Sequence, residues 1–530
     1  MSETPVKTSG GEIVRRAGIV ATGTLTSRIL GAVRDAVVAS VFALAATDAF
    51  WLAFTIPNAL RVLLGEGAVS AAFVPVFTEA EERAGRARAK EFFQNLVGSM
   101  AVVLLLVTVV GILAAPLIVK AYAFGFQRDA ALFDTTVGLT RVLFPYIFLM
   151  GISALMMGAL NARRRFAAPA FAPALLNVAL IASAFLIAPV VVSKGFPAIF
   201  ALAVGALLGG TLQILAQAPA LARQGLLVRP KLGFDDVYVR KCARLMVPLL
   251  AGLGVYQLNV LLSRLFASFL PTGSVSYLYY GQRLAEIPQG MFALAIASAA
   301  LPSLSRAVAT GHEDEAKRLF RHALRLSLFV AVPAGVALVV LAEPAVTVFF
   351  GRGKYDEHAI QETVRSFVWQ AAGIWAVASV RTIVPMFHAH NDTRTPVVAS
   401  ALNLVTFIAL SLTLMGPMQH AGLALATTAA SIAQFVALLW LLRRRTGPLG
   451  MEEINGSFVK TIVASAVMGL VIWWAAGFGK WQLGGNDPRN LVVFAVTAVA
   501  GLLVYLGTAA VLRSPELVDL RNALRRRIRA

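Results

Sequence analysis

Two long apolar stretches without a single charge restrict what this chain can fold into. Met100–Val119 and Leu491–Leu512 are each long enough to cross a hydrocarbon core about 30 Å thick as a helix. Only 14% of the residues in the whole chain are charged, whereas a soluble protein carries about 25%. A backbone in lipid must satisfy its own hydrogen bonds, and the alternating pattern of barrel strands does not occur here. The chain is therefore predicted to be an all-α polytopic membrane protein.

The apolar stretches together predict fourteen transmembrane helices. The first of them could be misread as a secretory leader, because Arg15 and Arg16 precede it. Its apolar segment runs on past Arg28 and Arg34, however, and many further spans follow, which favours a membrane helix. The expected spans are 14–42, 48–78, 92–121, 132–161, 168–193, 197–222, 238–270, 274–305, 318–346, 360–388, 397–415, 421–442, 457–478 and 490–512.

The net charge of +20 is distributed according to this topology. Of the 47 Lys and Arg residues, 32 lie in the amino terminus, the carboxyl tail and the loops after even-numbered spans. The loops after odd-numbered spans hold 7, and 8 lie inside spans. This asymmetry predicts that both termini are cytoplasmic. Basic runs such as Arg443–Arg445 are then topology signals and contacts for anionic membrane lipids, and no nucleic-acid partner is expected.

An internal repeat organises the chain. The segment "AFVPVFTEAEERAGRARAKEFF" (72–93) resembles "AALPSLSRAVATGHEDEAKRLF" (299–320) at an offset of 227, and the same offset joins Pro169 to Pro396. Each copy holds six spans, so both copies cross the membrane in the same direction, as in two-lobed transporters whose substrate path lies between the lobes. We expect an amino-terminal lobe over 1–222, a carboxyl-terminal lobe with its linker over 223–445, and an appended helix pair with a basic tail over 446–530.

Three of the expected spans combine arginines with acids and helix-breaking residues. A central arginine costs about 2.5–3.5 kcal/mol to insert, and its guanidinium keeps its proton in nearly any setting. Breaks such as Gly31 and Pro57 are tolerated where the backbone lines a cavity or is buried in protein. The polar residues of interest are Arg28, Arg34 and Asp35 in the first span, Asp48, Arg61 and Glu66 in the second, and Ser276, Arg283 and Glu286 in the eighth. One interpretation of this set is purely structural, namely ion pairs between helices.

The second interpretation is a binding site for an anion. Planar guanidinium groups suit phosphate because each donates two parallel hydrogen bonds, whereas a site for cationic drugs would be acidic. We therefore expect a lipid-linked phosphate or diphosphate as the substrate. The substrate-binding candidates are Arg28, Arg34, Arg61 and Arg283, and the gating, ion-pair or supporting candidates are Asp35, Asp48, Glu66, Ser276 and Glu286.

Motifs of catalysis or metal binding do not accompany these charges. The sequence contains no Walker A, GxSxG or CxxC pattern. "HAHND" (388–392) precedes Thr395-Pro396 and is predicted to be a helix-ending loop, and the single cysteine, Cys242, excludes an internal disulfide. We expect neither an enzyme nor a cofactor or metal. The membrane potential and ion coupling both stay open as energy sources.

Three segments carry a resemblance to a known family: "TSRILGAVRDAVVASVF" (26–42), "TDAFWLAFTIPNALRVLLGEGAVSAAFVPVF" (47–77) and "GSVSYLYYGQRLAEIPQGMFALAIASAALPSLS" (273–305). They resemble the MurJ (MviN) family of lipid II flippases in the multidrug/oligosaccharidyl-lipid/polysaccharide exporter superfamily. The resemblance implies a multi-pass protein of the bacterial inner membrane. It also implies transfer of lipid II, an undecaprenyl-diphosphate-linked peptidoglycan precursor, to the periplasmic leaflet by alternating access.

The resemblance extends to individual residues. The residues that the family requires match Arg28, Arg34, Asp48, Arg61, Glu66, Ser276, Arg283 and Glu286. Gln282 departs from relatives that carry an acid there, and the seventh span lacks the aspartate that binds sodium in some members. Cell-wall synthesis proteins are candidate partners. Alternatives are a flippase for another undecaprenyl-diphosphate-linked oligosaccharide, a cation or drug antiporter, and a membrane scaffold.

Overall fold

The computed structural model describes residues 10–63, 69–289 and 294–519, and in these ranges the chain is helical without a strand. The chain divides after Phe269 into two compact units. Nine helical stretches in the described ranges are long and apolar enough to cross a membrane. The predicted all-α membrane class is confirmed. The count of fourteen spans and the lobe boundaries at 222 and 445 stay predictions.

The first unit consists of helices that follow the expected spans one to seven. They are α1 (Gly10–Val41), α2 (Leu44–Arg61), α3 (Val69–Tyr122), α4 (Ala130–Leu143), α5 (Pro145–Ala162), α6 (Ala167–Leu186), α7 (Ala188–Ser193), α8 (Phe200–Arg223) and α9 (Val237–Ser268), with a short 3-10 turn η2 (Phe124–Arg128) after α3.

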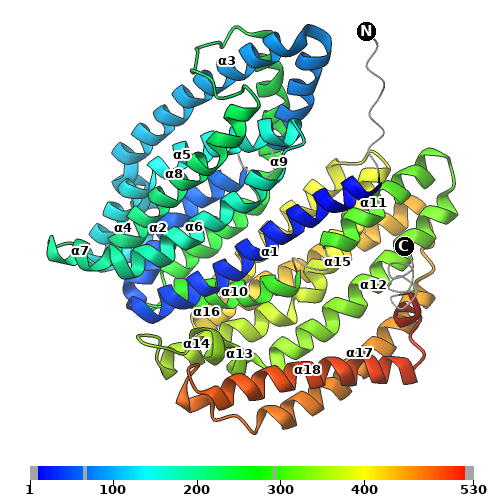
Figure 1. Cartoon of the computed structure of the whole chain (residues 1–530). Coiled ribbons are helices and arrows are strands. Elements are labelled where there is room, and N and C mark those ends of the chain that lie inside the picture. Colours follow the sequence, from blue (N-terminus) through cyan, green and yellow to red (C-terminus); the bar gives the residue numbers. More distant parts are fainter. Residues whose placement is uncertain (1–9, 64–68, 290–293, 520–530) are drawn as a thin grey trace. The chain divides into compact units, whose positions relative to one another are not determined.

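Several helices of the first unit pack side by side (Figure 1). α6 lies between α1 and α8, α3 packs against α5 and α9, and α2 packs against α4. α3 is interrupted at Gly85, whose φ of 83° lies in the left-handed region. The interruption folds the helix on itself, so the buried rings of Phe73 and Phe92 lie 5.8 Å apart.

The second unit follows the expected spans eight to fourteen. Its helices are α10 (Ser274–Pro288), α11 (Leu294–Ala309), α12 (Glu313–Val340), α13 (Ala342–Phe350), α14 (Glu357–Ala372), α15 (Ile374–Ala389), α16 (Arg394–Thr446), α17 (Met451–Ala476) and α18 (Pro488–Val511), with a short 3-10 turn η4 (Trp481–Leu483) between the last two.

The appended helices α17 and α18, orange to red in Figure 1, run side by side, and α17 packs along α12. The hydroxyl of Tyr505 on α18 donates to the carbonyl of Phe329 on α12 over 2.6 Å, which ties the pair to the same helix. α12 also packs against α15, and α10 packs against α14. α16 is interrupted at Gln419, which separates the eleventh from the twelfth expected span.

The helix boundaries repeat with the offset found in the sequence. α1 and α9 end at Val41 and Ser268, which are 227 positions apart. Arg164 and Asn391, also 227 positions apart, both have a φ of 56° at the end of a helix. A left-handed conformation is uncommon for residues other than glycine, so its recurrence at equivalent positions shows that the repeat is structural.

Candidate functional site

Arg34 and Asp35 form a buried ion pair in the first unit. The guanidinium of Arg34 donates to Asp35 Oδ1 through Nε (2.9 Å) and Nη2 (2.6 Å), and 6% of Arg34 and 2% of Asp35 are exposed. The face of Trp51 lies 5.7 Å from the guanidinium carbon, and this cation–π contact adds to the ion pair. Asp35 thus contacts Arg34 directly, and its supporting role in transport stays a prediction.

Asn177 on α6 fixes the same guanidinium from a second helix. Its Oδ1 accepts from Arg34 Nη1 over 2.9 Å, and its Nδ2 donates to the carbonyl of Ser27 over 2.9 Å. Because arginine can only donate, this network sets the orientation of the amide. The two helices approach closely nearby, where a Cβ on Gly23 would lie 2.5 Å from the carbonyl oxygen of Ala170. α1 runs through Gly31 as one helix, so the break expected at this glycine is not found.

The other charged candidates of the first unit differ in exposure. Arg28 is exposed, whereas Asp48 is 1% exposed. Arg61, at the end of α2, is half-buried, and its Nε donates to Asn58 Oδ1 one turn earlier over 3.0 Å. Glu66 lies outside the described residues. Arg34 is thus held in a buried ion pair, whereas Arg28 is exposed and Arg61 half-buried, and their roles in binding stay predictions.

In the second unit, Arg283 and Glu286 form an ion pair within α10. Arg283 Nη1 lies 3.0 Å from Glu286 Oε2, and Gln282 Nε2 donates to the other carboxylate oxygen over 3.0 Å. Arg283 also contacts Tyr279: its Nε donates to the tyrosine hydroxyl over 3.1 Å, and its guanidinium carbon lies 5.1 Å from the centroid of the tyrosine ring. The side chains of Arg283 and Glu286 are 40% and 39% exposed, while Ser276 on the same helix is fully buried.

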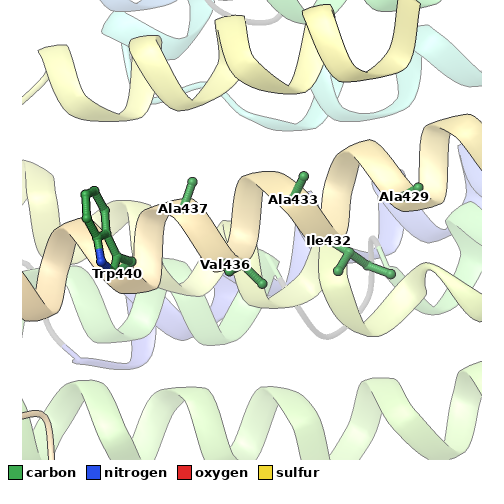
Figure 2. Close-up of a pocket in the computed structure, with 6 residues that line it drawn as sticks. All are labelled: Ala429, Ile432, Ala433, Val436, Ala437 and Trp440. Atoms are coloured by element: carbon green, nitrogen blue, oxygen red, sulfur yellow. The ribbon is translucent and has the colours of Figure 1, made fainter. Parts of the chain in front are cut away.

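One pocket in the second unit is apolar. It has a volume of about 580 Å³ and lies along α16, lined by Ala429, Ile432, Ala433, Val436, Ala437 and Trp440 (Figure 2). These side chains offer no charge to a phosphate. At the end of this groove, the guanidinium of Arg444 lies over the ring of Trp440, 3.7 Å from its centroid.

The segment 388–392 forms a helix end, as predicted. α15 ends at Ala389, and Asp392 Oδ1 accepts from the backbone N–H groups of Arg394 and Thr395 at the start of α16. Among the described residues, no group of three or more His, Cys, Asp or Glu is placed to hold a metal ion.

The family model described as "Lipid II flippase MurJ" matches residues 37–487, which is most of the chain. The chain belongs to the MurJ family. Its members are transporters, not enzymes. The family model covers Asp48, Arg61, Ser276, Arg283 and Glu286, while Arg28, Arg34 and Asp35 precede the matched range.

Curated relatives within the MurJ family match over nearly their whole length. The probable lipid II flippase MurJ of Vibrio cholerae is 34% identical over 515 residues, covering 95% of this chain and 97% of the relative. The lipid II flippase MurJ of Burkholderia cenocepacia is 32% identical over 499 residues, covering 91% and 94%. The multi-pass membrane character of the family agrees with the helical architecture.

Solved structures show the same fold. The inward closed conformation of a lipid II flippase MurJ superimposes with a TM-score of 0.76 at 24% identity, over 93% of this chain and 98% of that chain. An inward-facing multidrug transporter of the MATE family, in the MOP superfamily, superimposes with a TM-score of 0.62 at 16% identity, over 82% and 98%. These likenesses show that the chain shares its fold with both transporters.

Sequence reasoning missed several side chains that hold the charged candidates. Asn177, Asn58 and Tyr279 contact Arg34, Arg61 and Arg283 respectively. For Asn177 a signal existed, since an amide in an apolar span must find a hydrogen-bond partner. Asn58 and Tyr279 precede their arginines by three and four residues, a spacing that places side chains on the same helix face.

Proposed function

We propose that this protein moves lipid II from the cytoplasmic to the periplasmic leaflet of the bacterial inner membrane by alternating access. The observation that carries the proposal is the match to lipid II flippases over 91–97% of the chain. Arginines within apolar helices support it, because a diphosphate requires cationic donors where the surroundings are otherwise apolar.

The proposed binding groups are Arg28, Arg34, Arg61 and Arg283. Arg28 is exposed, Arg61 is half-buried and the side chain of Arg283 is 40% exposed, so these three would contact the diphosphate directly. Arg34 is held by Asp35 in this conformation, so its contribution would require that the ion pair loosen when substrate binds. Asp35, Asp48, Glu66, Ser276 and Glu286 would hold the arginines and exchange partners as the path opens to one side and then the other.

The proposed orientation follows from the distribution of basic residues. Both termini would be cytoplasmic, and the loops after odd-numbered spans would be periplasmic. The expected lobes over 1–222 and 223–445 and the helix pair over 446–530 remain the proposed functional divisions. An inside-negative potential would favour outward movement of an anionic headgroup by roughly 2.3 kcal/mol per charge per 100 mV. Proteins of cell-wall synthesis are proposed partners.

Replacement of the native flippase tests the residue roles. Arg28→Ala or Arg283→Ala, supplied as the sole copy, should abolish growth and lipid II export while the protein remains in the membrane. Arg365→Ala is the matched control, because Arg365 pairs within its own helix with Glu362 at 2.8 Å and lies outside the proposed set. Normal export by both test variants would refute the assignment of these residues.

Reconstitution tests the substrate. Purified protein in vesicles should flip lipid II faster than undecaprenyl-diphosphate carrying the sugars of other pathways. Equal rates would instead favour a general flippase for such lipids, and exchange of a cationic drug would favour the antiporter activity of the MATE transporters that share this fold.

A further inference from the structure

A buried histidine lies where three helices of the second unit meet. His420 directly follows the interruption of α16 at Gln419, and it is only 1% exposed. The centroid of its ring lies 5.2 Å from that of the Tyr277 ring on α10, and its Nε2 reaches the second turn of α14. The residue has no part in the proposed binding set, so its burial among these helices calls for another role.

The hydrogen bonds of His420 define a neutral ring. Nε2 lies 2.8 Å from the main-chain carbonyl oxygen of Glu362, and because a carbonyl oxygen only accepts, Nε2 carries the ring proton. Nδ1 has no hydrogen-bond partner among the residues that the structure describes. A second proton would therefore bind to Nδ1, where the described part of the chain offers it no acceptor.

Two charged groups act on the ring, both from α14, while α10 contributes the neutral ring of Tyr277. The Glu362 carboxylate lies 3.6 Å from Nε2, but both of its oxygens already accept from Arg365 Nη1, over 3.0 and 2.8 Å. His420 itself lies between the eleventh and twelfth expected spans. Its burial lowers its pKa below the ordinary value of a histidine; the carbonyl and carboxylate of Glu362 oppose this effect, and the positive charge of Arg365 adds to it.

The start of α10 is fixed against this ring. Tyr277 is 4% exposed, and its main-chain carbonyl accepts from Ser366 Oγ on α14 over 3.4 Å. The carbonyl of the next residue, Leu278, accepts from Gln370 Nε2 over 3.2 Å. α10 therefore meets both α14 and α16 near its start, so a displacement of the buried ring would act on the helix that also carries Arg283.

We propose that His420 is a positioning residue that links the placement of α10 to the acidity of the periplasm. While its ring is neutral, it holds the starts of α10 and α14 against the interruption of α16. Protonation places a charge in an almost fully buried site, and the contact loosens. The inference rests on the orientation in the proposed function, in which the segments before α10, before α14 and at Gln419 all follow odd-numbered spans and are periplasmic.

The expected pH dependence has a definite sign. Because the pKa of His420 is lowered in the folded protein, the neutral ring stabilises the folded state fully above the ordinary pKa of a histidine, about 6.5. This stabilisation is lost as pH falls through the lower pKa of the folded state. Acid should therefore open the start of α10 in the wild type.

Hydrogen exchange of the full-length protein in detergent, followed by mass spectrometry, tests the proposal. After correction for the intrinsic pH dependence of exchange, the amides of residues 274–280 should exchange faster at about pH 5 than at about pH 7.5, by as much as about tenfold for each unit by which the pKa is lowered. In His420→Gln and His420→Asn this increase should be absent, because their amides can donate to the Glu362 carbonyl but do not titrate. His358→Gln is the matched control, since His358 is exposed on α14 and its loss should leave the increase unchanged.

Two outcomes would overturn the proposal: an increase of the same size in both His420 variants, or exchange of residues 274–280 that does not depend on pH in the wild type. The first would assign the pH dependence to other groups, and the second would show that α10 does not follow the ring. A thermal melt at the higher pH checks that each variant is folded. The assay measures no transport, so its failure and a failure of the proposed flippase function are distinguishable.

Discussion

Asn177 is expected to stabilise the first unit strongly, because it joins α1 to α6 through the charged group of Arg34. The substitution Asn177→Ala removes one hydrogen bond from a guanidinium, worth about 1.5–3 kcal/mol, and one from the amide to a backbone carbonyl, worth about 0.5–1.5 kcal/mol. Asn177 is 5% exposed and Arg34 is 6% exposed, so water does not replace the lost partner. The expected loss in the free energy of unfolding is therefore about 2–4 kcal/mol.

Thermal unfolding in detergent measures this loss. For a unit of this size, about 1 kcal/mol shifts the melting temperature by roughly 2–4 °C, so Asn177→Ala should melt roughly 5–15 °C below the wild type. Val178→Ala is the matched control, since Val178 is the next residue on α6 and is 44% exposed. It should melt close to the wild type.

A functional readout separates positioning of Arg34 from general stability. At a temperature where both variants are folded, Asn177→Ala should export less lipid II than Val178→Ala, because the guanidinium loses one of its fixed contacts. If Asn177→Ala melted and exported like Val178→Ala, the inference that Asn177 restrains Arg34 would be wrong.

Three further predictions concern other parts of the chain. In the loop before α9, burial raises the pKa of the Asp236 carboxyl, but hydrogen bonds from Arg88, Asn95 and the N–H of Tyr238 outweigh burial and hold the pKa below its ordinary value. The ionised carboxylate therefore stabilises the folded protein fully above the ordinary pKa of an aspartate, and this stabilisation is lost as pH falls through the lower pKa of the folded state. The melting temperature of Asp236→Asn should accordingly depend less on pH in the acid range than that of the wild type. Glu516 is 1% exposed and accepts from Arg325 and Ser457 at 2.7 Å each. Glu516→Ala leaves the half-buried Arg325 with Glu453 alone, at 4.0 Å, and should cost about 1.5–3 kcal/mol in chemical unfolding, whereas the exposed Glu452→Ala should cost little. Gly23→Ala should lower the melting temperature by the equivalent of about 1–3 kcal/mol, because its Cβ would collide with α6, whereas Gly18→Ala, with nothing within 4 Å, should not.

The sequence was sufficient to predict the fold class, because helices in lipid are forced by backbone hydrogen bonding and show up as long apolar segments. The repeat was also visible from sequence, and the last residues of α1 and α9 agree with its offset. The interruptions were harder to place. Gln419 has a φ of 52° inside α16, and nothing in its residue type predicts a left-handed backbone.

The charged residues of the candidate site could be found from sequence, but their partners could not. An arginine in an apolar span is conspicuous, whereas its partner is decided by helix packing that brings together residues 143 positions apart, as for Arg34 and Asn177. Sequence reasoning therefore left two alternatives open: both Arg28 and Arg34 reach the cavity, or an acid holds Arg28 and only Arg34 contacts the phosphate. The structure shows that Asp35, the immediate neighbour of Arg34, pairs with it, while Arg28 is exposed.

The repeat duplicates the helices but not their charges, and this difference bears on function. The positions 227 residues after Arg28, Arg34 and Arg61 are Val255, Leu261 and Pro288, and the position 227 residues before Arg283 is Ile56. If the arginines served only to hold helices together, equivalent helices of the two copies would be expected to keep arginines at equivalent positions, as they keep equivalent ends. Their restriction to one copy at each position instead fits a substrate that is itself asymmetric, with a charged headgroup and an apolar tail. This asymmetry supports the proposed role of the arginines in substrate binding, which the Arg28→Ala and Arg283→Ala variants test.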